Sequence, residues 1–261
     1  MSHPVTGAAR SLETGGRMRV GIIGAGNMGS AFARRLSSVG HDVFIASRDI
    51  EDARNVAATV GAKVRPVPQQ QLAESADVLI AAVPYAQQAE ALRASGRLEG
   101  KTVIEISNPL TPDMSGLTVG HTTSAAEEVA KSASGAKVVK AFNTIFAQVL
   151  AERLSSTSAA KVQVFYAGDD AAAKRSVHAL IESMGFEPVD AGPLSNSRYL
   201  EPMGMLNIYF GYVAKMGTDI APAVRKVSAQ AAEPRAEQAA RQPGQTGSVA
   251  GRDEGARPSA G

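Results

Sequence analysis

The chain has 261 residues, a formal net charge of +2 at pH 7 and no cysteine. This length allows one large domain or two small ones, and so small a charge, without a basic stripe, argues against a nucleic-acid-binding protein. The lack of cysteine excludes disulfides, thiolate metal sites and cysteine nucleophiles, and no spacing of His or carboxylates suggests another metal site.

Residues 1–17 are predicted to be a disordered extension. They lack the apolar core of about 7 to 15 residues that a secretory signal requires. The longest apolar helix candidate, residues 203–216, is shorter than the roughly 20 residues needed to cross a bilayer. We therefore expect a cytoplasmic protein that does not bind a membrane.

Residues 18–48 predict a strand, a phosphate-binding turn, a helix and a second strand. An apolar run at 20–23 leads into the pattern Gly24-x-Gly26-x-x-Gly29, after which apolar residues recur at helical spacing. In a dinucleotide fold the first glycine makes the tight turn, the second lets backbone approach a pyrophosphate, and the third lets helix and strand pack closely. The anion would bind the unpaired N–H groups at the start of the helix.

Ser47 and Arg48 end the second strand, where NAD-binding domains usually place a carboxylate for the ribose 2′-hydroxyl. A hydroxyl and a guanidinium suit a 2′-phosphate, because Arg binds phosphate oxygens in a planar fork and a carboxylate would repel them. The sequence therefore predicts NADP(H) as the cofactor. Asp49 follows directly, which leaves open the alternative of a surface Arg at a strand end.

Strands and helices continue to alternate after Arg48. Helices are expected over residues 51–60 and 87–95, and strands over residues 63–67, 77–83 and 102–106. The unbroken apolar run at 77–83 fits a strand buried on both faces of a parallel sheet. The alternation predicts an α/β protein with a Rossmann-type, doubly wound, mostly parallel sheet. Ligands of such sheets bind at the carboxyl ends of the strands, where Pro84-Tyr85 and Asn108-Pro109 lie.

The second half of the chain repeats this pattern. A loop is expected over 110–121, a helix from the capping box Ser124-x-x-Glu127 to about 132, strands over 137–141, 162–167 and 187–190, and a helix with apolar residues at 173, 177, 180, 181 and 184. Asp169-Asp170 is interpreted as the cap of that last helix. Residues 18–135 are predicted to form the NADP-binding Rossmann domain, and residues 136–217 a smaller C-terminal α/β part that completes the cleft.

The long final helix, expected after Pro202, is apolar on two faces. One face carries Leu206, Tyr209, Phe210 and Val213, and the other carries Met205, Ile208 and Tyr212. Such a helix is either buried within the protein or shared with a partner, and we expect the contact of a homodimer. Residues 218–261 are rich in small and polar residues that cannot bury enough apolar surface to offset their ordering entropy, so a disordered tail is predicted.

Three segments carry a resemblance to a known family: KAFNT at 140–144, AGDD at 167–170 and AGPLSNSRYLEPM at 191–203. Together with GAGNMG and the Ser-Arg pair, they make residues 18–216 resemble the NADPH-dependent deazaflavin (coenzyme F420) reductase family. KAFNT is also similar to the NADPH-binding reductase domains of membrane metalloreductases. The resemblance implies an enzyme, an NADP-dependent oxidoreductase that transfers hydride between NADP(H) and F420 as the second substrate.

The resemblance also implies which residues bind each ligand. Those implied to bind NADP(H) are Gly24, Ala25, Gly26, Asn27, Met28, Gly29, Ser47, Arg48, Val83, Pro84 and Asn143. Those implied to bind the second substrate are Tyr85, Asn108, Pro109 and Phe142. The family often adds a basic residue a few positions beyond the Ser-Arg pair, but this chain has Asp52 there, with Arg54 as a substitute nearby. Weaker NADPH binding than is usual for the family is therefore expected.

Two alternatives to a deazaflavin reductase stay open. Hydride transfer to a deazaflavin depends on ring stacking more than on an acid or base, so no catalytic residue is predicted. Reduction of a small imine or carbonyl would need a proton from a positioned group, for which Tyr85, His121 and Tyr199 are the candidates, although His121 also fits a polar loop residue. The other alternative is a non-catalytic NADPH-binding sensor or partner subunit, which would depend on the final helix.

Overall fold

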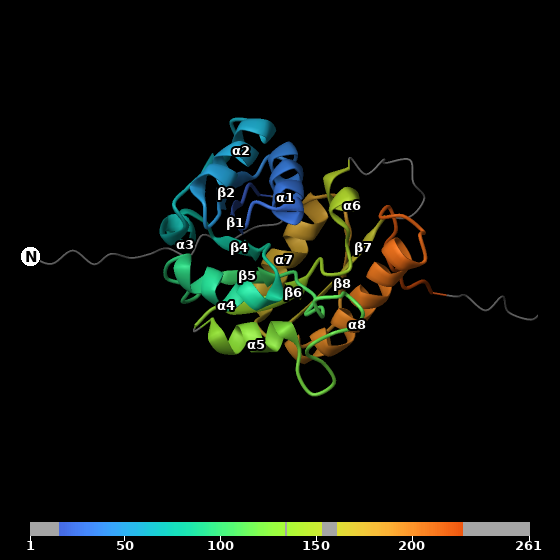
Figure 1. Cartoon of the computed structure of the whole chain (residues 1–261). Coiled ribbons are helices and arrows are strands. Elements are labelled where there is room, and N and C mark those ends of the chain that lie inside the picture. Colours follow the sequence, from blue (N-terminus) through green and yellow to red (C-terminus); the bar gives the residue numbers. More distant parts are fainter. Residues whose placement is uncertain (1–15, 134, 153–160, 227–261) are drawn as a thin grey trace, which may run out of the picture. The chain divides into compact units, whose positions relative to one another are not determined.

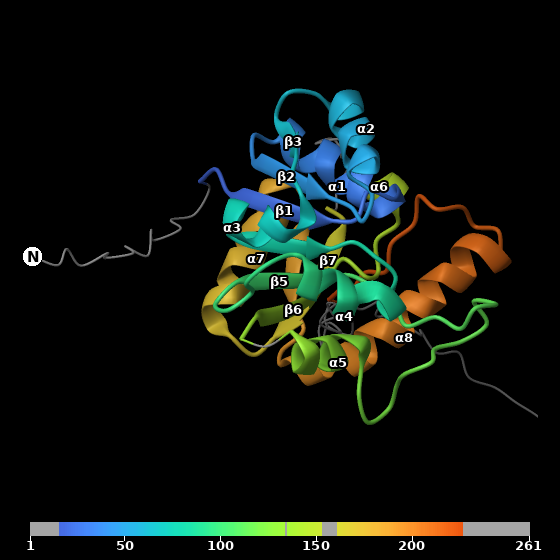
Figure 2. The same cartoon turned by 60° about the vertical axis from the view of Figure 1, so that its left-hand side comes forward.

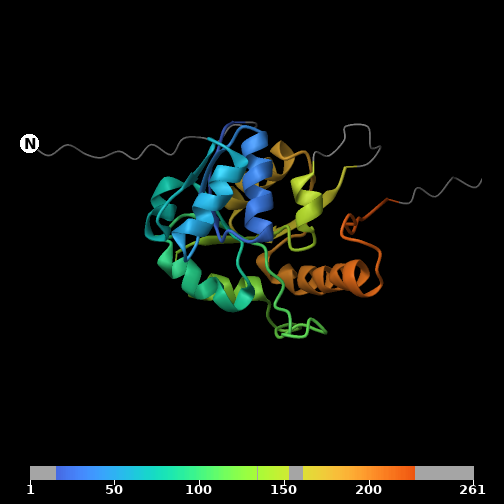
Figure 3. The same cartoon turned by 45° about the horizontal axis from the view of Figure 1, so that its top comes forward.

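The computed structural model describes residues 16–133, 135–152 and 161–226. The chain divides into two units, Met1–Val224 and Arg225–Gly261. All helices and strands below belong to the first unit, which Figures 1, 2 and 3 show from three directions. The predictions for residues 1–17 and 218–261 fall mostly outside the described residues.

An eight-stranded sheet runs through the first unit in the order β3-β2-β1-β4-β5-β6-β7-β8. The strands are β1 (Arg19–Ile23), β2 (Asp42–Ala46), β3 (Val64–Pro66), β4 (Val78–Ala81), β5 (Thr102–Glu105), β6 (Lys137–Ala141), β7 (Gln163–Gly168) and β8 (Glu187–Asp190). Neighbouring strands are parallel except that β7 runs antiparallel to β6. The predicted Rossmann-type, mostly parallel sheet is confirmed.

Helices cover both faces of this sheet (Figure 1). They are α1 (Asn27–Ser38), α2 (Ile50–Val60), α3 (Leu72–Ser75), α4 (Tyr85–Ala94), α5 (Ala125–Ser132), α6 (Ala147–Ala151), α7 (Ala171–Ser183) and α8 (Ser197–Ile208). One core layer joins α1, α2, α6 and α7 to one face, and a second joins α3, α4 and α5 to the other. The strands contribute alternate residues to the two layers, as the period of two in a strand requires.

Side-chain caps define where three helices begin. Asp49 accepts a hydrogen bond from the Glu51 N–H at α2, and Ser124 accepts one from the Glu127 N–H at α5, as its capping box predicted. At α7, Asp170 accepts bonds from the N–H groups of residues 172 and 173. Asp169 does not cap this helix, because its Oδ1 accepts a bond from the Leu194 N–H instead.

The final helix begins six residues earlier than predicted, at Ser197. Pro202 lies inside α8 and not at its start, and a π-helical turn, η3 (Tyr209–Val213), continues it. Proline removes one backbone donor and costs about 3 kcal/mol in a helix interior. The first turns form nevertheless because Leu200 and Glu201 are almost completely buried, at 3% and 1% exposed.

The sheet does not stop at the predicted boundary near residue 135. Strands β6, β7 and β8 continue the sheet of the first five strands, so the predicted parts 18–135 and 136–217 share it, and the boundary between them stays a prediction. Beyond the final helix, Ile220 packs against the core, and the backbone of Val224 exchanges hydrogen bonds of 2.8 and 3.2 Å with the Gln163 amide. Within the described residues, the helices are all too short or too polar to span a membrane.

The end of α8 and η3 expose apolar side chains. Leu206, Tyr209, Tyr212 and Val213 are each between 46% and 62% exposed. We predict that the protein is a homodimer through this face, because burying these side chains between two copies removes them from water. Light scattering should give twice the mass of one chain, and Leu206→Lys with Val213→Lys should halve it. Val224→Lys, at an exposed position outside the helix, is the control; a monomeric parent protein would contradict the prediction.

His41 joins the start of β1 to the end of α7. It is 3% exposed, its Nδ1 accepts a hydrogen bond from the Met18 N–H at 3.1 Å, and its Nε2 lies 2.8 Å from Ser183 Oγ. Burial lowers the pKa of His41, which the charge of Asp42 partly opposes. The folded protein therefore holds this imidazole in its neutral form at a pH where an exposed imidazole would be protonated.

We predict that stability falls as the pH drops below about 6.5, the ordinary pKa of His. Below that pH the unfolded chain binds a proton that the folded chain does not, so the free energy of unfolding decreases by at most about 1.4 kcal/mol per pH unit until the lowered pKa is reached. Denaturant titrations between about pH 7.5 and 5 measure this slope. His41→Gln should flatten it, and the exposed His121→Gln should not. Equal slopes in the parent protein and His41→Gln would contradict the assignment.

Candidate functional site

The turn between β1 and α1 is built on close approaches that only glycine permits. Gly24 has φ +107°, and a Cβ there would lie 2.6 Å from the Ala82 carbonyl oxygen. A Cβ on Gly29 would lie 2.0 Å from the Gly24 carbonyl oxygen. A Cβ on Gly26 would meet nothing within 4 Å, so the space above this residue is open. The first and third glycines therefore shape the turn, and the second faces free space, as the sequence pattern predicted.

The start of α1 is open to an anion. Gly26 occupies its cap position, makes no side-chain cap, and the first turn carries no acidic residue. The first N–H groups of a helix have no partner within the helix, and the helix dipole adds a partial positive charge there. The exposed Gly26 and Asn27 leave these groups accessible. This geometry suits a phosphate or pyrophosphate group.

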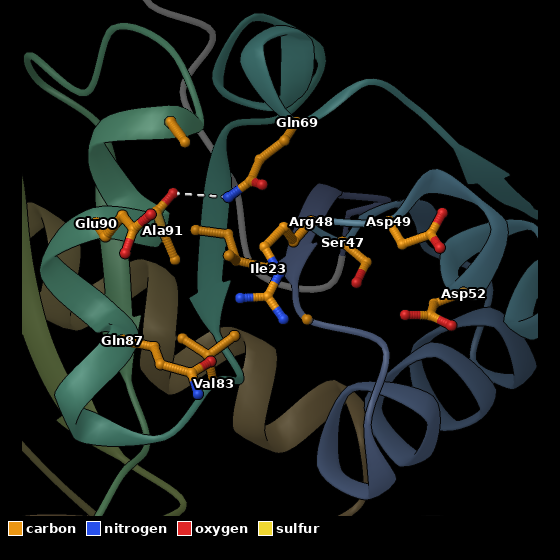
Figure 4. Close-up of a pocket in the computed structure, with 12 residues that line it drawn as sticks. Ile23, Ser47, Arg48, Asp49, Asp52, Gln69, Val83, Gln87, Glu90 and Ala91 are labelled. Atoms are coloured by element: carbon orange, nitrogen blue, oxygen red, sulfur yellow. Dashed lines mark hydrogen bonds between the residues drawn. The ribbon is translucent and has the colours of Figure 1, made fainter.

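A cavity of about 270 Å³ opens beside this turn, at the ends of β1, β2 and β4. Gly24, Ser47, Arg48 and Val83 line it together with residues of α4. Figure 4 shows the Arg48 guanidinium in the middle of the cavity, with Gln87 and Glu90 on one side and Asp49 and Asp52 on the other. Among the described residues, Arg48 has no ion-pair or hydrogen-bonding partner, so its donors are available to a ligand.

Acidic side chains surround this guanidinium. Asp49, Asp52 and Glu90 all line the cavity, which therefore carries three carboxylates against one guanidinium. Arg54, the expected substitute for a basic residue at position 52, does not line the cavity because it forms an ion pair with Glu51. The cavity can bind a phosphate through Arg48, but its lining as a whole is acidic.

A second cavity of about 280 Å³ lies on the other side of the glycine turn, between α1, the ends of β5 and β6, and α8. Asn108 and Asn143 meet at its wall: Asn108 Nδ2 donates to the Asn143 carbonyl at 2.8 Å, and Asn143 Nδ2 donates to Asn108 Oδ1 at 2.9 Å. The Asn108 amide lies against Gly204, where a Cβ would be 2.5 Å from its Oδ1. Asn143 Oδ1 is buried and has no hydrogen-bonding partner in the part of the chain that the structure describes. It can therefore accept one further bond.

The structure brings most of the implied site residues to these two cavities. The first cavity holds Gly24, Ser47, Arg48 and Val83, and the second holds Asn27, Met28, Asn108, Phe142 and Asn143. Ala25, Gly26 and Gly29 form the turn between them. Pro84 caps α4, Tyr85 begins it, and Pro109 is buried after β5; these three line neither cavity.

Phe142 lines the second cavity but its ring lies in the core, and its implied role as a substrate contact stays a prediction. Its side chain is 0% exposed and packs edge-to-face against Phe32 and Phe186, with ring centroids 5.1 and 6.2 Å apart. Its backbone has φ +61°, a conformation that non-glycine residues rarely adopt. The ring therefore anchors the end of β6 in the core, while the neighbouring Asn143 is among the polar residues that line the second cavity.

Sequence reasoning missed a buried charge cluster, Glu105–Lys140–Glu201, behind the second cavity. Lys140 is 0% exposed, and its Nζ donates to Glu105 Oε2 at 2.5 Å, to Glu201 Oε1 at 2.8 Å and to the Ser107 carbonyl at 2.5 Å. The only sequence signal for it was a charged residue within or directly after each of two apolar strands, β5 and β6. That pattern did not indicate which of the charged residues would form ion pairs.

The three candidate proton donors lie in different places. Tyr85 is partly buried at the start of α4, and its pKa is raised, first by burial and then by the charges of Glu128, Glu201 and Glu105. His121 and Tyr199 are exposed and line a separate cavity of about 750 Å³ beside the start of α8. The charges of Glu201 and Glu105 thus reach the Tyr85 phenol.

Comparisons with known proteins agree with this geometry. The metalloreductase STEAP3 of Rattus norvegicus is 30% identical over 183 residues, which cover 70% of this chain and 36% of that protein. A solved structure of a candidate F420-dependent NADP reductase from Arthrobacter sp. FB24 matches with a TM-score of 0.72 and 26% identity, over 80% of this chain and 100% of that one. The hypothetical protein SMa0349 from Sinorhizobium meliloti matches with a TM-score of 0.63 and 35% identity, over 69% of this chain and 88% of that one.

The chain spans between 36% and 44% of the length of the curated metalloreductases that it matches. Residues 19–109, which contain the glycine turn, Arg48 and the ends of β4 and β5, match the family model described as NADP oxidoreductase coenzyme F420-dependent. The fold, the open helix start and the Arg48 guanidinium in the cavity are features that suit a dinucleotide with a 2′-phosphate. Over residues 19–109 the chain therefore matches the family of coenzyme F420-dependent NADP oxidoreductases, and over most of its length it is similar to a candidate reductase of that kind.

Proposed function

We propose that the protein transfers hydride between NADP(H) and a deazaflavin coenzyme of the F420 class. The observation that carries this proposal is the Arg48 guanidinium, which projects into a cavity that begins at the glycine turn and has no partner among the residues that the structure describes. Further support comes from the family description and from the name of the Arthrobacter neighbour.

The described residues fit NADP(H) at three points. The open start of α1 would hold the pyrophosphate, and Ser47 with Arg48 would hold the 2′-phosphate. Val83, Pro84 and the unpaired Oδ1 of Asn143 would lie at the nicotinamide end, where the oxygen can accept a bond from an amide. When bound, NADPH supplies a hydride, and its nicotinamide ring is left with a positive charge.

The second cavity would receive the hydride acceptor. The mutual hydrogen bonds of Asn108 and Asn143 fix the polar wall, and Met28, Ile208 and Tyr212 supply apolar surface. A flat ring needs little more than such a rigid wall, because hydride transfer depends on orientation. If the acceptor were an imine or a carbonyl, Tyr85 at the start of α4 would be the candidate proton donor, but its raised pKa makes the phenol a weaker acid and it does not line the second cavity.

We expect rapid loss of the visible absorption of oxidised F420 when purified protein and NADPH are mixed in a stopped-flow instrument. NADH run alongside should react much more slowly, because it lacks the phosphate that Arg48 would bind. If NADPH binds and F420 does not bleach, the acceptor proposal fails, and small imines and carbonyls become the next substrates to test. Binding of NADPH without oxidation by any of these acceptors would favour the sensor hypothesis.

We also expect Arg48→Glu to weaken NADPH binding by roughly 10- to 100-fold while NADH binding changes little, because a charge-assisted hydrogen bond is worth about 1.5–3 kcal/mol. Calorimetric titration of both nucleotides measures the two affinities. Arg54→Glu changes the net charge equally but outside the cavity, so it should have a much smaller effect. Asp52→Asn should act in the opposite sense and tighten NADPH binding. An unchanged NADPH-to-NADH preference in Arg48→Glu would overturn the phosphate assignment.

A further inference from the structure

The Glu105–Lys140–Glu201 cluster is completely buried, yet each of its polar atoms has a partner. Glu105 Oε1 accepts bonds from Gln88 Nε2 and from the Ser107 N–H, both at 2.7 Å, and Oε2 accepts from Lys140. Gln88 Nε2 also donates to the Val83 carbonyl at 3.3 Å, which fixes the orientation of its amide. Every neighbour of the Glu105 carboxyl group is thus a donor.

Glu201 has the same kind of surroundings. Its Oε2 accepts a bond from the Ala125 N–H at 2.9 Å, and its Oε1 accepts from the Ala126 N–H at 3.2 Å and from Lys140. Both N–H groups belong to the start of α5, whose dipole favours a negative charge. A protonated carboxyl group would need an acceptor, and neither Glu has one in this arrangement, so both are carboxylates.

The cluster therefore holds two carboxylates against one ammonium group, an excess of one negative charge. The partial charge at the start of α5 offsets about half of an elementary charge. The negative charge that is not offset acts through the protein interior, where water screens it poorly. Burial first, and then the charges of Glu128, Glu201 and Glu105, raise the pKa of Tyr85, so both glutamates of the cluster act on this neighbouring phenol.

Short connections join the cluster to the positions assigned to the nicotinamide. Gln88 Nε2 bonds both Glu105 and the carbonyl of Val83. On the other side, Asn143 Nδ2 donates at 2.7 Å to the carbonyl of Leu200, the residue next to Glu201. The buried charge is therefore linked to Val83 by two hydrogen bonds through Gln88, and Glu201 is one residue away from a partner of Asn143.

We propose that the Glu105–Lys140–Glu201 cluster is an electrostatic positioning element that makes the site prefer the oxidised, cationic nicotinamide over the reduced, neutral one. This inference rests on the proposed NADP(H) site. A fixed negative charge beside the place where positive charge develops lowers the cost of hydride donation, and it does so without reorganisation. Glu105, Lys140 and Glu201 would act through this field and through the backbone they hold, without touching the substrate.

The test compares the dissociation constants of NADP⁺ and NADPH in single-charge variants. Glu201→Gln and Glu105→Gln each remove one negative charge at nearly constant shape. A unit charge that acts over roughly 10–15 Å at an effective dielectric constant of about 20 changes a binding constant on the order of five- to fifteenfold. We expect the Kd of NADP⁺ divided by that of NADPH to rise by this factor in either variant, measured by calorimetry.

Two controls separate charge from structure. Glu99→Gln removes the same charge from an exposed side chain ahead of β5, at the opposite ends of the strands, and should leave the ratio unchanged. The double variant Lys140→Gln with Glu201→Gln restores the excess of one negative charge while it changes the hydrogen bonds. In this double variant the Kd of NADP⁺ divided by that of NADPH should return toward the value of the parent protein, even if the variant is less thermally stable.

The outcomes distinguish the inference from the function on which it rests. If the affinities for NADP⁺ and NADPH fall equally in both single variants, the cluster only supports the fold and the inference is overturned. The same holds if the double variant keeps the altered ratio. If the parent protein binds neither nucleotide, the proposed function itself is wrong. Because the two glutamates lie on different elements, the second variant remains a test if the first does not fold.

Discussion

The buried ion cluster around Lys140 is the interaction on which the arrangement of the site depends. It joins β5, β6 and the start of α5 to α8, and Gln88 adds α4. Burying charges costs several kcal/mol per ion, and removing one partner of such a pair typically destabilises a protein by about 3–5 kcal/mol. The cluster is therefore a poor source of net stability but a strict constraint on geometry. It fixes the end of β5, and so the position of Asn108, relative to the final helix.

Glycine residues shape the same region as strongly as the charged residues do. Gly24 and Gly29 bring the first strand and helix into contact, and Gly204 lets α8 approach the Asn108 amide. Each approach is closer than any Cβ would allow, so the turn and the final helix face one another across a narrow space. Interiors pack too densely to absorb such an overlap, and a methyl group at any of these positions would move the wall of a cavity.

The electrostatics of the two cavities differ in origin. In the first, the Arg48 guanidinium lies among three solvent-accessible carboxylates, and water and salt will weaken the competition of these carboxylates with a bound phosphate. Behind the second, the excess charge is shielded from water, so its influence should persist at physiological ionic strength. Affinity for the phosphate and preference for one redox state would thus be set in separate places, by groups that can be changed independently.

The sequence by itself determined the elements and the phosphate-binding turn. The periodicity that places Val177 and Leu180 in the core, the glycine spacing at residues 24–29 and the Ser124 cap are local signals, because each depends on residues within a few turns of one another. The position of Ser47 and Arg48 beside the glycine turn also followed from the sequence, because neighbouring parallel strands end at the same edge of the sheet. The tertiary structure alone decided which buried charges meet: Lys140 binds carboxylates that lie 35 and 61 residues away. It also decided that the Phe142 ring enters the core and that α8 continues through Pro202, because burial against distant residues outweighs local preference.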